Sequence, residues 1–241
     1  MRSAQTTPHN THWITANQLI IARSLSEFVY EQELVASKLE DDTYQVILNH
    51  VPYQFSATLS LWDLLIIDPS SPTRHGQLAT DALRFCLDLK KALLVDDIVF
   101  GNWLEDVQNT LHNEFQRLEK LAKYDASQLL QLDEPQLQGL LDAHPKIIAN
   151  RGRLGWGAIE NQHYSPESLN SFQLEFLAAH KSILTTGHLN RFNNRELMGS
   201  MMGDAHYQAL QQQLLNALED SELAPEELAL IPCHPWQYQH H

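Results

Sequence analysis

The residues best suited to chemistry gather between Ala143 and Gly157, where a His-Pro step, an asparagine, two arginines and three glycines lie close together. Arg151 and Arg153 flank Gly152, so the backbone can turn tightly there and approach a ligand. Residues two apart in an extended segment point to the same face, and a guanidinium bonds phosphate or carboxylate oxygens two at a time. Both arginines could therefore grip one anion. The simpler interpretation, a surface turn with two solvated arginines, stays open at this point.

Several familiar catalytic motifs are missing from the sequence. No glycine-rich loop is followed by Lys-Ser or Lys-Thr, and the glycines at 152, 155 and 157 have the wrong spacing for a dinucleotide fingerprint. The sequence contains neither a Gly-x-Ser-x-Gly elbow nor a His-Glu-x-x-His metal helix. The chain has 13 histidines, but neither the pair near its start nor the pair at its end has a Cys or carboxylate at ligand spacing. We therefore expect no metal site built from these histidines.

Charge and composition narrow the class of protein. A net charge of -14 over 241 residues argues against nucleic acid as a partner, because a backbone binder needs a basic stripe. Cys86 and Cys233 lie far apart among apolar residues, as expected for free thiols in a reducing compartment. No signal-peptide pattern and no apolar run of membrane-spanning length is present. We expect a soluble cytoplasmic protein with no membrane partner.

Apolar residues recur at helical spacing or alternate at strand spacing along most of the chain. The pattern predicts helices over 15–38, 76–94, 96–124, 133–141, 193–202 and 205–220. It predicts strands over 44–48, 53–59, 61–67 and 228–231, and leaves 172–184 ambiguous between helix and strand. The expected fold class is α+β, with a mostly helical N-terminal domain that carries a small antiparallel meander over residues 1–142. A second, mixed and incomplete domain is expected over residues 143–241.

Two segments together resemble the aerobactin synthetase (IucA/IucC) family of siderophore synthetases, which work without a nonribosomal peptide assembly line. That family shows His-Pro, four variable residues and then Asn-Lys-Gly-Arg-x-Gly-aromatic. This chain has His144-Pro145 and then Asn150-Arg151-Gly152-Arg153-Leu154-Gly155-Trp156. The family later has a strand running into His-Pro-Trp-Gln, which is matched by residues 230–237. Tyr164-Ser-Pro-Glu167 and the early helix with Ser26-Glu27 and Tyr30-Glu31 are similar as well.

The sequence departs from the family pattern in two respects. Arg151 stands where the family usually carries Lys, which keeps the positive charge but replaces a compact ammonium by a planar fork. Family members are also more than twice as long and are built from thumb, fingers and palm regions. The resemblance places this chain at the thumb and the start of the fingers. The remaining nucleotide segment and the carboxylates that hold Mg²⁺ are then expected outside it.

The resemblance implies an ATP-dependent ligase. In that chemistry a carboxylate of citrate or a dicarboxylic acid attacks the α-phosphorus of ATP, and an amine or hydroxylamine then displaces AMP from the acyl-adenylate. The implied ATP and acyl-adenylate contacts are His144, Asn150, Arg151, Arg153 and Gly155, together with His234 and Gln237 on the nucleotide side of the fingers. No catalytic residue is assigned. The implied cofactors are ATP and Mg²⁺, and the implied protein partner is the missing C-terminal half.

Alternatives remain at this stage. Trp236, which would support His234 and Gln237, fits core packing at a strand end at least as well. Arg191 and Arg195 could add positive potential, although solvated surface positions explain them more simply. A non-catalytic binding or assembly module that retains only the N-terminal fold is the alternative function. A homodimer stays open, because a truncated fingers region would expose apolar surface.

Overall fold

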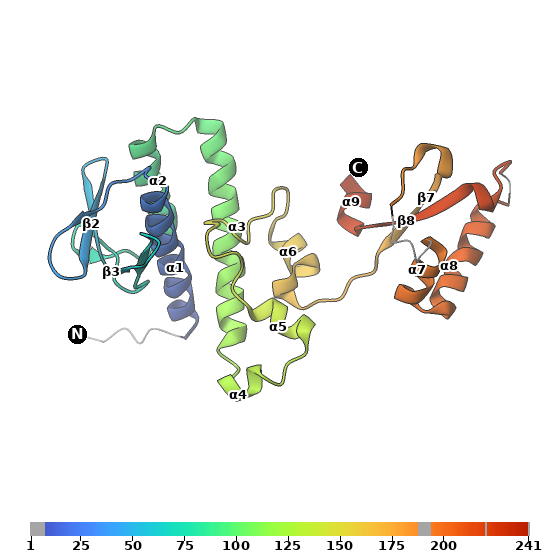
Figure 1. Cartoon of the computed structure of the whole chain (residues 1–241), viewed down its shortest axis with the longest axis horizontal. Coiled ribbons are helices and arrows are strands. Elements are labelled where there is room, and N and C mark those ends of the chain that lie inside the picture. The colour runs from blue at the N-terminus through green and yellow to red at the C-terminus, as the bar shows by residue number, and fades with distance from the viewer. Residues whose placement is uncertain (1–7, 188–193, 220, 241) are drawn as a thin grey trace. The chain divides into compact units, whose positions relative to one another are not determined.

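The computed structural model describes residues 8–187, 194–219 and 221–240. The chain divides into two compact units, Met1–Ser171 and Phe172–His241, which can be followed by colour in Figure 1. Arg191 and the side chain of Arg195 lie outside what is described.

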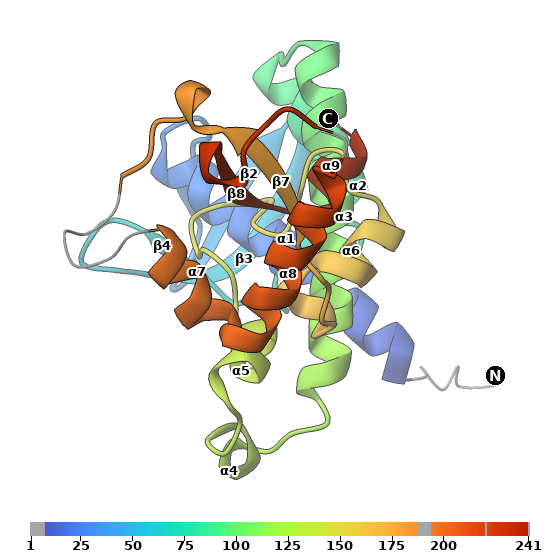
Figure 2. The ribbon, with the colours of Figure 1, turned by 90° about the vertical axis from the view of Figure 1, so that its right-hand side faces the viewer.

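Three long helices form the frame of the first unit: α1 (Pro8–Tyr30), α2 (Ala82–Leu93) and α3 (Asp97–Leu121). Aspartates cap the second and third of these, since Asp81 accepts from the amide of Arg84 and Asp96 accepts from the amides of Ile98 and Val99. α1 and α3 run side by side (Figures 1 and 2). This leaves one long side of α3 available for the segments that follow it.

A small antiparallel sheet packs beside these helices. Its strands are β1 (Ser37–Lys38), β2 (Thr43–Leu48), β3 (Val51–Leu59), β5 (Thr73–Arg74) and β6 (Gln77–Leu78), in that order, and β4 (Leu65–Ile67) pairs with β3. β3 alternates as a half-buried strand should, with Tyr53, Phe55 and Ala57 inward. The main core therefore forms between this sheet and the three helices.

Shorter elements complete the chain. They are α4 (Ala126–Leu129), α5 (Glu134–Leu140), α6 (Ala158–Tyr164) and the 3₁₀ turn η1 (Pro166–Ser168) in the first unit. The second unit contains β7 (Glu175–His180), η2 (Lys181–Ile183), α7 (Asn194–Met202), α8 (Asp204–Ala217), η3 (Pro225–Glu227), β8 (Leu228–Cys233) and α9 (Pro235–His240). β7 and β8 pair as a two-stranded antiparallel sheet. Among the described residues of this unit, the apolar residues Leu228 and Pro235 are buried.

The α+β class expected from the sequence is confirmed, with corrections to individual elements. The first helix ends at Tyr30, and residues 37–38 lie in a strand instead. The third strand shortens to Leu65–Ile67 because the preceding residues turn, with Asp63 at φ 59°. The ambiguous segment 172–184 contains strand β7, whereas α6 and α9 were not expected.

The boundary between the two units falls after Ser171, later than the expected domain boundary after residue 142. The reason is that residues 143–157 pack along α3 and so belong to the first unit.

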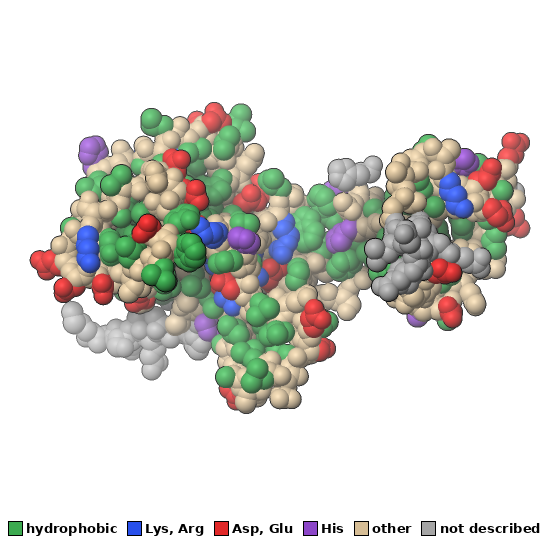
Figure 3. Space-filling model, viewed as in Figure 1, with side chains coloured by type: hydrophobic (Ala, Val, Ile, Leu, Met, Phe, Trp, Pro, Cys, Tyr) green, Lys and Arg blue, Asp and Glu red, His purple; other side chains and the backbone are tan. Residues whose placement is uncertain are grey.

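On the face of the first unit seen in Figure 3, few Lys and Arg side chains reach the surface. Within the described ranges, none of the helices combines the length and apolar character that crossing a membrane requires.

Candidate functional site

A polar stripe on α3 holds residues 143–157, the cationic loop. Asn109 Nδ2 donates to the carbonyl oxygen of Trp156 at 2.9 Å, and Asn113 Nδ2 donates to the carbonyl oxygen of Arg151 at 3.1 Å. The hydroxyl of Thr110 accepts from the amide of Arg151 at 3.2 Å. Residues three and four apart share one face of a helix, so these side chains form a single row beneath the loop. The loop is thereby fixed to a rigid element.

Two glycines let the cationic loop take this path. A Cβ added at Gly152 would lie 2.7 Å from the carbonyl oxygen of Asp106 and 2.8 Å from its Cβ, so a side chain there would collide with α3. Gly155 has φ 79°, in the left-handed region that glycine occupies without strain. Gly152, which suggested a ligand-binding turn in the sequence, is therefore required for close packing against α3.

Arg151 is buried, with 2% of the residue exposed. Its Nε donates to Glu114 Oε2 at 3.0 Å, its Nη1 to Glu167 Oε1 at 2.6 Å and its Nη2 to the carbonyl oxygen of Leu141 at 2.6 Å. The guanidinium is thus bonded to the protein in all three directions. All three of its nitrogens are engaged inside the unit, and its predicted contact with ATP or the acyl-adenylate stays a prediction.

Arg153 is placed differently, with 26% of its side chain exposed. Its Nη2 donates to both oxygens of Glu167, at 3.1 and 3.0 Å. Its Nη1 donates to Asn161 Oδ1 at 3.2 Å and to the carbonyl oxygen of Arg151 at 3.3 Å. No partner for its Nε is found among the described residues. The Nε–H of this guanidinium is therefore not engaged by the described residues, and its Cζ lies 5.5 Å from the centroid of the Trp156 ring.

The two arginines do converge on one anion, as their spacing suggested, but the anion is the carboxylate of Glu167. Burial alone would raise the pKa of Glu167, but the charge of Arg153 and the hydrogen bonds from both guanidiniums outweigh it and lower that pKa. Glu167 therefore stays ionised. Glu114 bridges Arg151 to Arg117, whose Nε and Nη2 donate to it at 3.0 and 2.5 Å. We call Glu114, Arg117, Arg151, Arg153 and Glu167 the charged cluster.

His144 and Asn150 shape the first half of the cationic loop. Asn150 Nδ2 donates to the carbonyl oxygen of His144 at 3.1 Å, which closes the loop on itself. His144 Nδ1 accepts from the amide of Lys146 at 3.2 Å. Asn150 Oδ1 is buried and has no hydrogen-bond partner among the described residues. His144 is exposed at the surface, and the contacts of His144 and Asn150 with ATP or the acyl-adenylate stay predictions.

His234 and Gln237 belong to the second unit. His234 follows β8, where its Nδ1 accepts from the amide of Trp236 at 3.1 Å, and its ring lies 4.7 Å from that of Phe172. Trp236 stacks on His240 with ring centroids 4.6 Å apart, and Gln237 is exposed on α9. The joint action of these residues with the cationic loop stays a prediction.

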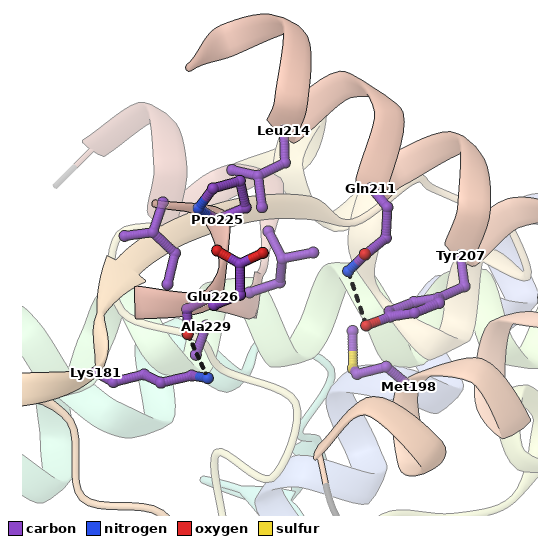
Figure 4. Close-up of a pocket in the computed structure, with 10 residues that line it drawn as sticks. Lys181, Met198, Tyr207, Gln211, Leu214, Pro225, Glu226 and Ala229 are labelled. Atoms are coloured by element: carbon purple, nitrogen blue, oxygen red, sulfur yellow. Dashed lines mark hydrogen bonds between the residues drawn. The ribbon is translucent and has the colours of Figure 1, made fainter. Parts of the chain in front are cut away.

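Two hollows are alternative candidate sites. One beside the cationic loop, of about 650 Å³, is lined by Glu27, Glu31, Glu33 and Asp106 together with Lys146 and apolar groups. These carboxylates disfavour an anionic ligand. The second, of about 340 Å³, lies in the second unit between α8, η3 and β8 (Figure 4). There Gln211 donates to the Tyr207 hydroxyl and Lys181 donates to the carbonyl oxygen of Glu226. None of the predicted site residues lines either hollow.

Sequence reasoning missed the residues that organise the site. The motif analysis singled out none of Asn113, Glu114 and Arg117, which form a buried polar row on α3. The signal was present, because polar residues recur at 106, 109, 110, 113, 114 and 117 in the helical spacing that the leucines also follow. In the part of the chain that the structure describes, no three His, Cys, Asp or Glu side chains form a group able to hold a metal ion.

Comparison with known proteins gives consistent matches. Residues 136–241 match the model of the IucA / IucC family. The chain is 30% identical to aerobactin synthase of Escherichia coli over 94% of its own length and 38% of that protein. It is 28% identical to putrebactin synthase of Shewanella sp. (strain MR-4) over 95% of its length and 37% of that protein.

A solved structure matches as well. Aerobactin synthetase IucC from a hypervirulent pathotype of Klebsiella pneumoniae superposes with a TM-score of 0.83 at 29% identity, over 95% of this chain and 41% of that one. The chain therefore spans about two fifths of the length of the proteins it matches.

Proposed function

Because this chain belongs to the IucA / IucC family, we propose that it is part of an ATP-dependent, AMP-forming ligase of siderophore biosynthesis. The proposed reaction joins a carboxylate of citrate or a dicarboxylic acid to an amine or hydroxylamine through an acyl-adenylate. The matches to aerobactin and putrebactin synthases support the reaction class. The identity of the acid and of the amine stays open.

The observation that carries this proposal is the placement of Arg153. It presents a partly exposed guanidinium, held by Glu167 and Asn161, in a chain whose net charge is -14. A fixed cation at the surface of an otherwise acidic protein suits a phosphate or an acyl carboxylate. We assign Arg153 to direct contact with the anion and Arg151 to holding the loop.

The chemistry explains why a fixed guanidinium would help. Negative charge develops on phosphoryl oxygens during adenylation and on the carbonyl oxygen during displacement by the amine. Donors that already point at these oxygens stabilise the transition state without reorganising. In this proposal His144 donates to the same anion, Asn150 and Gly155 shape the loop, and His234 and Gln237 approach the nucleotide from the fingers side.

Mg²⁺ would neutralise phosphate charge in such a reaction. The cationic loop contains no carboxylate, the side chain that Mg²⁺ prefers, so we propose that its ligands lie in the remaining part of the enzyme. The 38% coverage of aerobactin synthase supports this division. For the same reason we propose that residues 1–241 alone do not carry out ligation. On the alternative proposal, the chain is a binding or assembly module that retains the fold without the chemistry.

The test uses the complete protein that contains this chain and measures pyrophosphate release from ATP with citrate and a panel of amines. We expect Arg153→Ala to lower kcat/KM by about two orders of magnitude, as when one donor to a developing oxyanion is removed. Arg84→Ala is the control, because Arg84 is an exposed arginine on α2 with only a 3.9 Å contact to Asp88. Pyrophosphate release that is unchanged by Arg153→Ala would refute the site assignment. Absence of any release from the complete protein would favour the assembly module.

A further inference from the structure

The charged cluster has an unusual balance for a buried group of side chains. Arg117, Arg151, Glu114 and Glu167 are each less than a tenth exposed. Three guanidiniums face two carboxylates, which leaves one positive charge in excess. Unpaired charge is expensive in a low-dielectric interior, so the excess has to lie where solvent or a counter-ion can reach it.

The surroundings of the cluster do not remove this excess. Asp142 lies 4.0 Å from Arg151, but Arg23 also bonds this carboxylate at 3.2 Å. Lys120 adds a further cation, because its ammonium donates to the carbonyl oxygen of Glu167. Among these cations, Arg153 combines contact with Glu167 and a donor that has no partner among the described residues. The excess charge is therefore presented at the partly exposed guanidinium of Arg153.

Glu167 orients that guanidinium. Both of its oxygens accept from Nη2 of Arg153, and one of them also accepts from Arg151 at 2.6 Å. The carboxylate is itself fixed, because it sits in the turn η1 and is 3% exposed. Asn161 holds the other terminal nitrogen of Arg153. The guanidinium is bonded through Nη1 and Nη2, and its Nε has no hydrogen-bond partner among the described residues.

We propose that Glu167 is a positioning residue for Arg153, and that the phosphate or carboxylate of the ligand is the counter-ion that completes the charged cluster. This inference rests on the proposed function, since it concerns the same anion site. It assigns to Glu167 an effect on binding opposite to the effect of its charge. As a simple negative charge it would weaken anion binding, whereas as a positioning group it strengthens it.

Glu167→Gln separates these two roles because it removes the charge and keeps the shape. If Glu167 positions Arg153, tripolyphosphate should bind the purified 241-residue chain about tenfold more weakly in the variant, as measured by calorimetry at low salt. NMR of the Arg153 Nε–H in the ligand-free protein reports rotation of the guanidinium. This rotation should be restricted in the unaltered chain and fast in the variant. Glu105→Gln is the matched control, because it removes one exposed carboxylate from α3 without touching the cluster.

A second variant guards against simple loss of folding. Asn161→Ala removes the hydrogen bond from Nη1 of Arg153 to Asn161 and leaves every charge in place. Like Glu167→Gln, it should therefore weaken tripolyphosphate binding. Hydrogen exchange of the α3 amides reports whether each variant is folded. Equal or tighter binding in folded Glu167→Gln, or unchanged guanidinium rotation, would overturn the positioning role. Absence of tripolyphosphate binding by the unaltered chain would overturn the counter-ion role, while pyrophosphate release by the complete protein tests the proposed function separately.

Discussion

Replacing Arg151 with Met tests whether buried charges hold the cationic loop on α3. The guanidinium makes three hydrogen bonds, to Glu114, Glu167 and the carbonyl oxygen of Leu141, at 3.0, 2.6 and 2.6 Å. Removing one partner of a buried ion pair typically costs about 3–5 kcal/mol, because the other charge is left uncompensated. Here each carboxylate keeps a second arginine, Arg117 or Arg153, so we expect the lower end, about 3 kcal/mol.

The assay is thermal unfolding followed by circular dichroism, with hydrogen exchange to localise the loss. In a domain of this size 1 kcal/mol corresponds to roughly 2–4 °C, so Tm should fall by about 6–12 °C. Exchange should accelerate most for the amides of α3 and of the cationic loop, where the amide of Arg151 bonds to Thr110. The two-stranded sheet of the second unit should exchange as before.

Arg151→Lys provides the graded control for this prediction. A lysine keeps the charge but offers its donors from one nitrogen, so it reaches fewer of the three acceptors than the planar fork does. We expect Arg151→Lys to lower the free energy of unfolding by about 1–2 kcal/mol, so that its stability lies between those of the Met variant and the unaltered chain. The reasoning would be refuted if the Met variant unfolded within about 0.5 kcal/mol of the unaltered chain, the range of a neutral surface substitution.

Three further predictions concern packing and pH. Gly152→Ala should lower the free energy of unfolding by about 1–3 kcal/mol, because the added Cβ would meet the α3 backbone. Gly101→Ala should raise it by about 0.5–1 kcal/mol, because an added Cβ inside α3 has nothing within 4 Å. Paired thermal melts measure both changes. The guanidiniums of Arg151 and Arg153 lower the pKa of Glu167 against the effect of burial. The folding free energy that this carboxylate contributes is therefore complete above pH 4.5, its ordinary pKa, and is lost as the pH falls through its lowered pKa. Melts across acidic pH should show this loss, and Glu167→Gln should not. Burial raises the pKa of Cys86 to about 12, so stability should fall once the pH exceeds the ordinary thiol pKa. In the folded protein alkylation should then reach Cys233 before Cys86, by mass spectrometry.

The sequence predicted the fold class and most long elements because their burial pattern is local. β2 and β3 alternate as expected, and α3 carries its leucines at helical spacing. Errors arose where the decisive partner is remote or where a few residues turn. α6 begins at Ala158 because Glu160 accepts from the amide of Gly157, a short-range cap that periodicity does not register.

The candidate site was only partly predictable from residue types. The sequence singled out Arg151 and Arg153 and the idea that they share one anion. It did not indicate that Arg151 is buried, because this depends on Glu114, 37 residues earlier, and on Glu167, 16 residues later. The spacing of two arginines fixes their common face, but it does not say whether that face meets solvent or another helix.

The arginine at position 151, where the family usually carries lysine, follows from the geometry of its acceptors. Glu114, Glu167 and the carbonyl oxygen of Leu141 surround the guanidinium on three sides, and a planar fork bonds all three at once. The same carboxylate, Glu167, then orients Arg153. Stability of the loop and orientation of the exposed cation therefore depend on one shared group, so a substitution that relaxes Arg151 should also change anion binding at Arg153. Double-mutant cycles between positions 151 and 153 should give a coupling energy of about 0.5–3 kcal/mol, and strict additivity would show that the two arginines act independently.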